Sequence, residues 1–297
     1  MAKYLFRIVS ASFRKSLILL ISAAALLVVL WTDPGGSNAL SVHFLDVGQG
    51  DSELVVLPGG ATILIDGGPA NGSLHSALGT VLPFSRRSID VVLLSHPQTD
   101  HFGGLIEVFR RYRVGALVHS GYRGDGVAAE AFWDAVQESG TDSIAVRKGS
   151  RIRYGESSAT VLSPERSNSK ANANDDSVAL LVQSNGASLF LAGDAGGKRE
   201  EEIGTTAGFV DVLKVSHHGS RFSSTAQFLK IIQPRIAVIE VGKNGYGHPA
   251  PETMRRLADS GAVVLDTKTH GTVSLTIRNG EISIFTESGR DAERQAP

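Results

Sequence analysis

The chain contains no cysteine among its 297 residues. Disulfide bonds, thiolate metal ligands and thiol nucleophiles are therefore all excluded. No Gly-x-Ser-x-Gly motif occurs either, so the sharp turn that presents a serine nucleophile in α/β-hydrolases is not predicted. Hydrophobic residues make up 42% of the chain, which is enough to form a substantial core.

Aromatic residues and positive charge are also scarce. Aromatic side chains account for 6% of the residues and the formal net charge is −1. Without residues 1–39 the net charge becomes −4. A generally basic surface for polyanions is therefore not predicted, and neither is a platform for stacking bases. A local basic strip is one interpretation of a group of arginines, and a solvated helix face is the simpler one: Arg110, Arg111, Arg113 and Arg123.

The N-terminus differs in composition from the rest of the chain. Four basic residues precede an uncharged apolar run, 17–31, which is followed by Ser37-Asn38-Ala39. A positive flank, a short hydrophobic centre and a Ser-x-Ala end are typical of a secretory signal peptide. The alternatives are an uncleaved transmembrane anchor with its basic end in the cytoplasm, or a buried helix. Both export interpretations place Leu40 onward outside the cytoplasm, as a membrane-anchored or a secreted, periplasmic domain.

Several apolar segments end in residues that commonly ligate metal ions. Segment 91–95 leads into His96-Pro97-Gln98-Thr99-Asp100-His101, and five of the nine histidines lie in loops of this kind. The other apolar segments are 62–65 before Asp66, 188–193 before Asp194, 210–216 before His217-His218-Gly219-Ser220, and 235–241 before the loop that contains His248. Neutral nitrogen donors combined with anionic oxygen donors favour Zn²⁺ or Mn²⁺. We therefore expect these loops to converge on one metal site at a sheet edge.

Short strands and amphipathic helices alternate along the mature chain, which predicts one domain over 40–286 with mixed sheets covered by helices. Asn185-Gly186 predicts a tight hairpin between two strands. Segment 164–177 is predicted to be a loop, and 287–297 a polar tail. Helices are expected at 105–112, 127–139, 224–232 and 251–260, and strands at 41–45, 54–57, 61–65, 178–184, 187–191, 262–266, 272–277 and 281–285.

These motifs resemble the metallo-β-lactamase superfamily, and within it the extracellular hydrolase domain of the ComEC/Rec2 DNA-uptake proteins. The resemblance covers nearly all of 41–285 in the family's order. It rests on the segments 44–51, 65–68, 95–104, 174–177, 193–194, 213–220 and 246–249. It implies an αββα sandwich with a dinuclear metal site, here preceded by one N-terminal hydrophobic helix. The multispanning channel of those proteins is missing from this chain, so a separate channel protein is an expected partner.

The family pattern His-x-His-x-Asp-His is changed at one position, because Gln98 stands at the second histidine. A further expected histidine is replaced by the region of Asn174 and Asp175. ComEC-like domains commonly depart at both positions. The amide of Gln98 is a poorer ligand for Zn²⁺ than imidazole and is more compatible with Mn²⁺.

The resemblance implies two divalent ions, Zn²⁺ or Mn²⁺. One would be held by Asp100, His101 and His248, with Asp194 bridging. The weaker site would use His96, Asp194 and His218, with Gln98 or Asp175 contributing.

Asp66 is expected to orient a ligand or the water at the metals. His217 is expected to be structural, a proton donor, or the ligand in place of His218. Asp100, His217 and His218 are therefore the catalytic candidates. Lys214 and Ser220 are candidates for contact with a substrate phosphate, although a surface role is the simpler interpretation.

The leading hypothesis is an extracytoplasmic metal-dependent phosphodiesterase, with DNA as the substrate that the family analogy suggests. Its nuclease activity would act during DNA uptake. A second hypothesis keeps the chemistry and changes the substrate to a phosphoester of a cell-surface polymer, as in phosphorylcholine esterases. A third is a non-catalytic binding module of the same fold.

Overall fold

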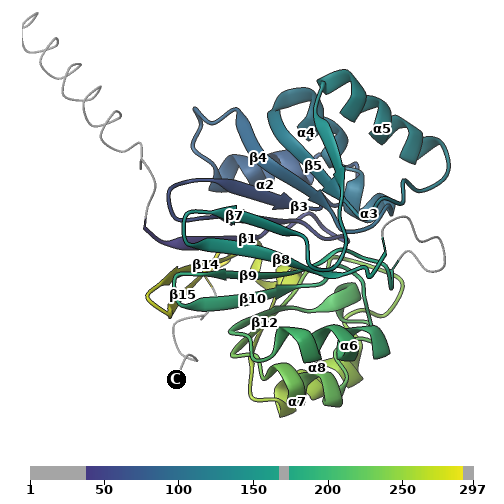
Figure 1. Ribbon diagram of the computed structural model, residues 1–297. Helices are drawn as coiled ribbons and strands as arrows, with labels where there is room; N and C mark the ends of the chain where they lie inside the picture. Colours follow the sequence, from purple (N-terminus) through teal and green to yellow (C-terminus); the bar gives the residue numbers. More distant parts are fainter. Residues whose placement is uncertain (1–37, 167–173, 290–297) are drawn as a thin grey trace, which may run out of the picture. The chain divides into compact units, whose positions relative to one another are not determined.

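Figure 1 shows the computed structural model, which describes residues 38–166 and 174–289. The hydrophobic helix expected near the N-terminus falls on residues outside these ranges. Within the described ranges, no helix is both long and apolar enough to cross a membrane.

The first of two mixed sheets has eight strands, in the order β15-β14-β1-β2-β3-β4-β5-β6. The strands from β3 to β6 are parallel, and the remaining pairs are antiparallel. Their bounds are β1 (Leu40–Phe44), β2 (Glu53–Val56), β3 (Thr62–Ile65), β4 (Ser88–Leu94), β5 (Arg113–His119), β6 (Asp142–Ala145), β14 (Val273–Arg278) and β15 (Glu281–Thr286).

The second sheet has seven strands, in the order β13-β12-β11-β10-β9-β8-β7, and β10 to β13 are parallel. Their bounds are β7 (Arg151–Tyr154), β8 (Ser157–Ser163), β9 (Ala179–Ser184), β10 (Ala187–Leu191), β11 (Val212–Lys214), β12 (Ile236–Ile239) and β13 (Val263–Asp266).

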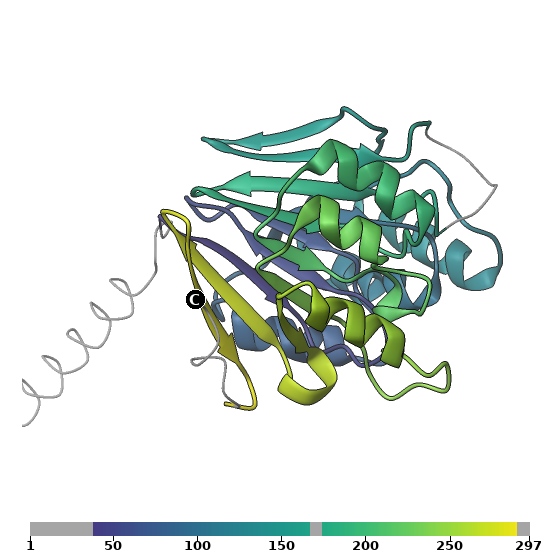
Figure 2. The same ribbon diagram turned by 90° about the horizontal axis from the view of Figure 1, so that it is seen from below.

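The two sheets face each other across an apolar core, and helices cover their outer faces (Figures 1 and 2). Val42 and Ile63 of the first sheet pack in this core with Val182 and Leu189 of the second. The helices over the first sheet are α2 (Ser73–Val81), α4 (Leu105–Arg111) and α5 (Val127–Ser139). Those over the second are α6 (Lys198–Ala207), α7 (Ala226–Ile232) and α8 (Pro251–Asp259). The described residues therefore form the predicted αββα sandwich.

Three short helical segments lie at strand ends: α3 (Thr99–Phe102), the 3₁₀ turn η1 (Ser216–Gly219) and α9 (Thr267–His270). Two of them carry predicted ligands. Strands β3 and β4 are parallel neighbours, as are β10, β11 and β12, so the carboxyl ends within each group lie at one edge of its sheet. The fold thus positions the candidate residues by strand direction.

Local predictions agree with the structure at several elements. Helix α5 spans 127–139 as expected, and Asn185 and Gly186 both have positive φ, as the tight hairpin turn requires. Residues 287–289 of the predicted polar tail lie within the described ranges. Glu287 is held by Thr272, whose backbone N–H donates to Glu287 Oε2, and Ser288 N donates to His270 O. Residues 290–297 lie outside the described ranges.

Candidate metal centre

Close backbone packing at the end of β3 and β4 shapes the first half of the candidate site. Gly67 and Gly104 lie so near each other that a Cβ on Gly104 would stand 2.2 Å from the Gly67 carbonyl oxygen. Similarly, a Cβ on Gly50 would stand 2.3 Å from the Asp100 carbonyl oxygen. These contacts hold the loop with His96, Asp100 and His101 against the strands that precede it.

The loop after β4 and the loop after β10 bring three predicted ligands together. His96, His101 and Asp194 each offer a ligand atom within 4.8 Å of the others, and all three are buried. Asp194 Oδ2 lies 3.5 Å from His101 Nε2 and 3.9 Å from His96 Nε2. A carboxylate from one loop that lies near two imidazoles of another loop is in a suitable position for a bridging ligand.

A second group of candidate ligand atoms contains His218. Ligand atoms of Asp100, His101 and His218 lie within 4.8 Å of one another, and His218 Nε2 is 3.5 Å from Asp100 Oδ2. The sequence interpretation placed His248 with Asp100 and His101, and His218 with His96 and Asp194. Ligand atoms of His218 and Asp194 also lie within 4.8 Å of each other, in a group with Asp51. His218 takes this place because His217 and His218 both adopt a left-handed backbone, with φ of 51° and 52°. This turn buries the ring of His218 and leaves that of His217 partly exposed.

Each of the three buried histidines has one ring nitrogen engaged and the other unpartnered. His101 Nδ1 lies 2.7 Å from Asp66 Oδ2, His218 Nδ1 lies 2.9 Å from the Glu240 carbonyl oxygen, and His96 Nδ1 lies 3.0 Å from Ser95 Oγ. Their Nε2 atoms are buried without a hydrogen-bond partner, and so is Asp194 Oδ1.

Buried polar atoms that lack partners are costly, and a metal-ligating histidine usually has its second nitrogen held as it is here. The donor set of imidazoles and carboxylates therefore fits divalent cations such as Zn²⁺ or Mn²⁺.

Asp66, which the sequence interpretation expects to orient a ligand or the water, lies directly behind His101. Besides His101, its carboxylate accepts hydrogen bonds from the backbone N–H and the hydroxyl of Ser95. Burial raises the pKa of Asp66, although His101 and Ser95 counteract this effect. Asp66 thus fixes the ring plane of a ligand without competing for the same atom.

The electrostatics of the centre are dominated by burial and by mutual attraction. Burial alone would raise the pKa of Asp194, but His101 and His218 outweigh it and hold that pKa well below its usual range. Burial is also the largest effect on His218, and the charges of Asp51 and Asp194 outweigh it and raise its pKa to about 10. In His96, burial prevails and lowers the pKa to about 3.

The buried ion pair of Asp51 and Lys214 was not recognised as such from the sequence. Both side chains are completely inaccessible, and Lys214 Nζ also donates to the Gly193 carbonyl oxygen at 2.8 Å. Asp51 Oδ1 lies 3.1 Å from His218 Nδ1. The prediction of a surface role or a phosphate contact for Lys214 is therefore wrong, because Lys214 is buried behind the candidate ligands. The apolar strand that ends in Lys-Val-Ser-His-His does not indicate this ion pair, because Asp51 and Lys214 are 163 positions apart in the sequence.

His217 and His248 lie at the outer side of the centre. His217 Nε2 is 3.9 Å from Asp194 Oδ2, and the side chain of His217 is 38% exposed. The rings of His217 and His248 have centroids 5.6 Å apart, and His248 Nδ1 is buried without a hydrogen-bond partner. Both histidines therefore border the centre, outside the tightly grouped ligand atoms.

The remaining candidates are divided between the centre's edge and the supporting loops. Gln98 Nε2 donates to Asn174 Oδ1 at 2.5 Å, so these two side-chain amides form a hydrogen bond with each other. The backbone carbonyl of Asp175 accepts from Arg199, and Asp175 is not among the grouped ligand residues. Ser220 is buried in a turn, where its carbonyl oxygen accepts from Ser223 and Thr253. Direct contact of Ser220 with a substrate phosphate is not favoured by this position.

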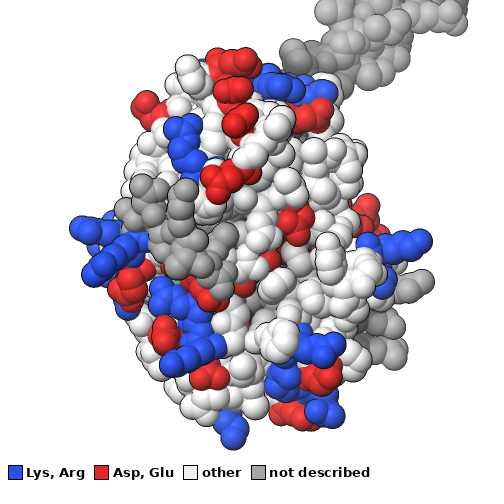
Figure 3. Space-filling view, turned by 90° about the vertical axis from the view of Figure 1, so that its right-hand side faces the viewer, with Lys and Arg blue, Asp and Glu red and all other residues white. Residues whose placement is uncertain are grey.

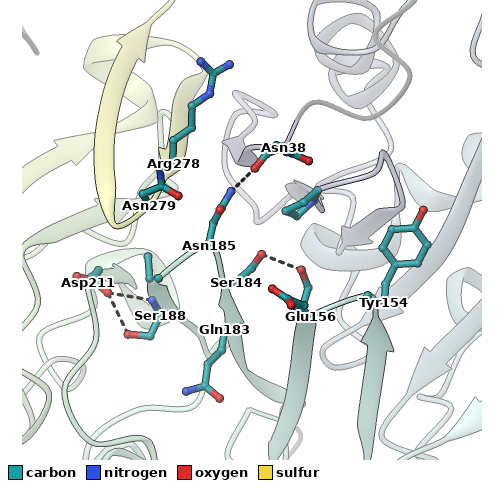
Figure 4. Close-up of a pocket in the computed structure, with 15 residues that line it drawn as sticks. Asn38, Tyr154, Glu156, Gln183, Ser184, Asn185, Ser188, Asp211, Arg278 and Asn279 are labelled. Atoms are coloured by element: carbon teal, nitrogen blue, oxygen red, sulfur yellow. Dashed lines mark hydrogen bonds between the residues drawn. The ribbon is translucent and has the colours of Figure 1, made fainter.

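A large open groove of about 1070 Å³ lies at the opposite ends of the strands (Figure 4). Hairpin turns line it: the side chain of Asn185 donates to the Asn38 carbonyl oxygen, and Asp211 accepts from Ser188. None of the grouped ligand residues lines this groove. The chemistry of the described residues is thus concentrated at the other end of the sandwich.

A sandwich of two mixed sheets, with imidazoles and carboxylates gathered at one sheet edge, defines the class of metal-dependent hydrolase folds. The family model of the metallo-beta-lactamase superfamily matches residues 45–242, and the chain belongs to this superfamily. The fold binds divalent metal ions, often two, and the candidate ligand groups described above fit that property.

The chain is also similar to competence proteins of the ComEC family. It is 29% identical over 278 residues to ComE operon protein 3 of Bacillus subtilis (strain 168), covering 86% of this chain and 36% of that protein. It is 28% identical over 247 residues to Recombination protein 2 of Haemophilus influenzae, covering 82% of this chain and 29% of that protein. The chain therefore spans about a third of the length of these relatives.

Among solved structures, the metallo-beta-lactamase fold protein YhfI from Bacillus subtilis is similar with a TM-score of 0.54 at 13% identity. The match covers 84% of this chain and all of that chain. This likeness supports the fold.

Proposed function

We propose that this chain is an extracytoplasmic metal-dependent phosphodiesterase that acts on nucleic acid. The observation that carries the proposal is the set of unpartnered, buried Nε2 atoms of His96, His101 and His218 around Asp194. In the proposed arrangement, residues 1–39 act as a signal peptide or a single membrane anchor, and 40–286 form the hydrolase domain. The similarity to proteins named for competence and recombination supports DNA as the substrate. A multispanning channel protein is the partner that we propose for such a domain.

The roles of the residues follow from their positions. Asp194 would bridge two divalent ions, with His96 on one side and Asp100, His101 and His218 on the other. When bound, such ions supply Lewis acidity toward a phosphoryl oxygen and make a water molecule easier to deprotonate. Asp66 and the Glu240 carbonyl keep the rings of His101 and His218 in the orientation that leaves each Nε2 free to bind an ion. His217 is partly exposed, and its Nε2 can deliver a proton to the leaving oxygen.

Replacing Asp194 tests the proposal most directly. Asp194→Ala should abolish both metal retention after dialysis against Mn²⁺ or Zn²⁺ and hydrolysis of bis(p-nitrophenyl) phosphate. Elemental analysis and absorbance assays measure the two effects. The matched control is Asp134→Ala, which removes an exposed carboxylate from α5 and should change neither. Full metal content and full rate in the Asp194 variant would show that the assigned bridge is wrong.

A further inference from the structure

Two large aromatic side chains are exposed on the loops that carry the outer histidines. Phe222 follows the His217-His218 turn by a few residues and is 74% exposed, and Tyr246 precedes His248 by two residues and is 76% exposed. Two exposed rings are thus presented by the two loops that flank the candidate centre. The low aromatic content of the sequence gave no indication of this local concentration.

Tyr246 is connected to the metal centre through a row of rings. The centroids of Tyr246 and His248 are 5.9 Å apart with an interplanar angle of 35°, and those of His248 and His217 are 5.6 Å apart. His217 in turn lies 3.9 Å from Asp194. A planar group resting against Tyr246 would therefore be near a phosphate held at the centre.

The loop that presents Tyr246 is fixed by one asparagine. Asn244 Oδ1 accepts from the backbone N–H groups of Tyr246 and His248, and Asn244 Nδ2 donates to the carbonyl oxygens of His248 and Gly242. Ala250 N donates to the carbonyl oxygen of Gly219, which joins this loop to the one with His218. Because the backbone is already ordered, stacking on Tyr246 would cost little additional entropy.

Phe222 is presented by a compact turn. Ser223 N and Ser223 Oγ both donate to the Ser220 carbonyl oxygen, and Phe222 N lies 3.4 Å from Ser220 Oγ. The Phe222 carbonyl oxygen would stand 3.3 Å from a Cβ at Gly197, three residues after Asp194. The second aromatic residue is thus also held beside a loop that carries a ligand.

The charges beside these rings distinguish between two substrate classes. Arg221 and Lys243 are exposed on the same two loops. Arg221 directly precedes Phe222, and Lys243 stands three residues before Tyr246. On the face seen in Figure 3, further lysine and arginine side chains lie toward the edge, interspersed with aspartate and glutamate side chains. Aromatic rings can bind a quaternary ammonium group such as choline, but neighbouring cations oppose that binding and favour a polyanion.

We propose that Tyr246 and Phe222 form a stacking subsite for bases of a single-stranded polynucleotide, with Arg221 and Lys243 contacting its phosphates. Exposed base faces occur in single strands, and aromatic stacking combined with cationic contacts is the usual means of binding them. The inference deepens the proposed phosphodiesterase function, because the subsite would align a strand beside the hydrolytic centre.

The test measures binding separately from hydrolysis. A fluorescein-labelled hexathymidylate and an abasic strand of the same length are titrated into the metal-free full-length chain and followed by anisotropy. The parent should bind the thymidylate more tightly than the abasic strand. Phe222→Ala/Tyr246→Ala should remove this preference, with a loss of at least about 5-fold in affinity for the thymidylate.

Two control variants separate stacking from charge. Phe209→Ala removes a ring that is 72% exposed beside the distant groove, and it should leave both affinities unchanged. Arg221→Ala/Lys243→Ala should weaken binding of both strands alike and flatten the dependence on salt. The titrations are repeated with Ca²⁺ present. If the metal-free protein unfolds, the measurements with Ca²⁺ decide the result.

Two outcomes would overturn the subsite. One is an unchanged preference for thymidylate in the Phe222/Tyr246 variant. The other is displacement of the strand by phosphorylcholine in the parent but not in that variant, which would assign the rings to a choline group. If base-dependent binding is found but no phosphodiester is hydrolysed with Mn²⁺ or Zn²⁺, the hydrolytic function fails while the subsite remains.

Discussion

At the scale of single residues, the buried pair of Lys214 and Asp51 should have a large energetic consequence. Removing one partner of a buried ion pair leaves an uncompensated charge, which costs roughly 3–5 kcal/mol. Lys214→Met should therefore lower the free energy of unfolding by about that amount, measured by urea titration of the metal-free protein. The double variant Lys214→Met/Asp51→Asn should recover part of the loss.

The matched control for this prediction is Lys230→Met, which removes an exposed lysine from α7. It should change the free energy of unfolding by no more than about 0.5 kcal/mol. Equal stability of Lys214→Met and Lys230→Met would contradict the importance of the buried pair.

Glu200 gives the protein a dependence of stability on pH. Its carboxyl is completely buried in α6, and burial raises its pKa from 4.5 to about 8, although Ser224 donates to it. Between these values the folded state binds more protons than the unfolded state, so stability falls as pH rises. The contribution is fully present below pH 4.5 and is lost as pH passes about 8.

Glu200→Gln replaces this carboxyl with a neutral group of the same shape. We expect the variant to gain stability over the parent as pH rises from 5 to 8.5, by on the order of a few kcal/mol, since one pKa unit corresponds to about 1.4 kcal/mol. Thermal and urea unfolding across this range would measure it. Glu202→Gln, on the exposed side of the same helix, should follow the parent curve. Parallel curves for Glu200→Gln and the parent would refute the prediction.

The sequence revealed individual ligand residues better than their grouping. His96, Asp100 and His101 could be recognised because a strand end and a short loop place them locally. The position of His218 depends on two consecutive left-handed residues, which propensities for ordinary side chains do not predict. The pairing of Asp51 with Lys214 depends on two sheets packing together, and no local pattern contains that information.

At the scale of elements, α7 illustrates how one side chain sets a helix start. Thr225 Oγ1 accepts the backbone N–H of Phe228, and it also donates to Glu201 Oε1 of α6. Thr225→Ala should therefore destabilise the protein by about 1 kcal/mol, measured by urea unfolding. Thr206→Ala, an exposed substitution in α6, is the control and should have a much smaller effect. A loss as small as that of the control would show that the cap contributes little.

Elements with a strong local signal were predicted closely, and those fixed by tertiary contacts were not. Helix α8 begins with Pro251 as expected, because proline suits a first helical turn. Helix α7 was expected from Ser224, but this residue is buried with positive φ and its N–H donates to Glu200. The hydrogen bond between Ser224 and Glu200 connects α6 to the start of α7. It forms only because the two helices pack together, and the residue pattern does not reveal that packing.

At the scale of the whole molecule, metal binding should stabilise the folded state. A ligand at about 100 times its Kd adds about 2.7 kcal/mol, which corresponds to a rise in Tm of about 5–10 °C for a domain of this size. Mn²⁺ or Zn²⁺ should produce this shift in calorimetry, and chelation should reverse it. Asp194→Ala should show no shift. A shift of equal size in that variant would place the stabilising ion elsewhere.

Each of the two sheets supplies only part of the candidate ligand set. His96, Asp100 and His101 follow β4 in the first sheet, whereas Asp194 and His218 follow β10 and β11 in the second. In the proposed centre, chelation would therefore depend on the apolar layer that holds the sheets face to face, although that layer contains no donor atom of its own. Loosening this layer, for example with Leu189→Ala, should weaken cation affinity from a distance. Neither half of the chain should retain tight chelation when produced separately.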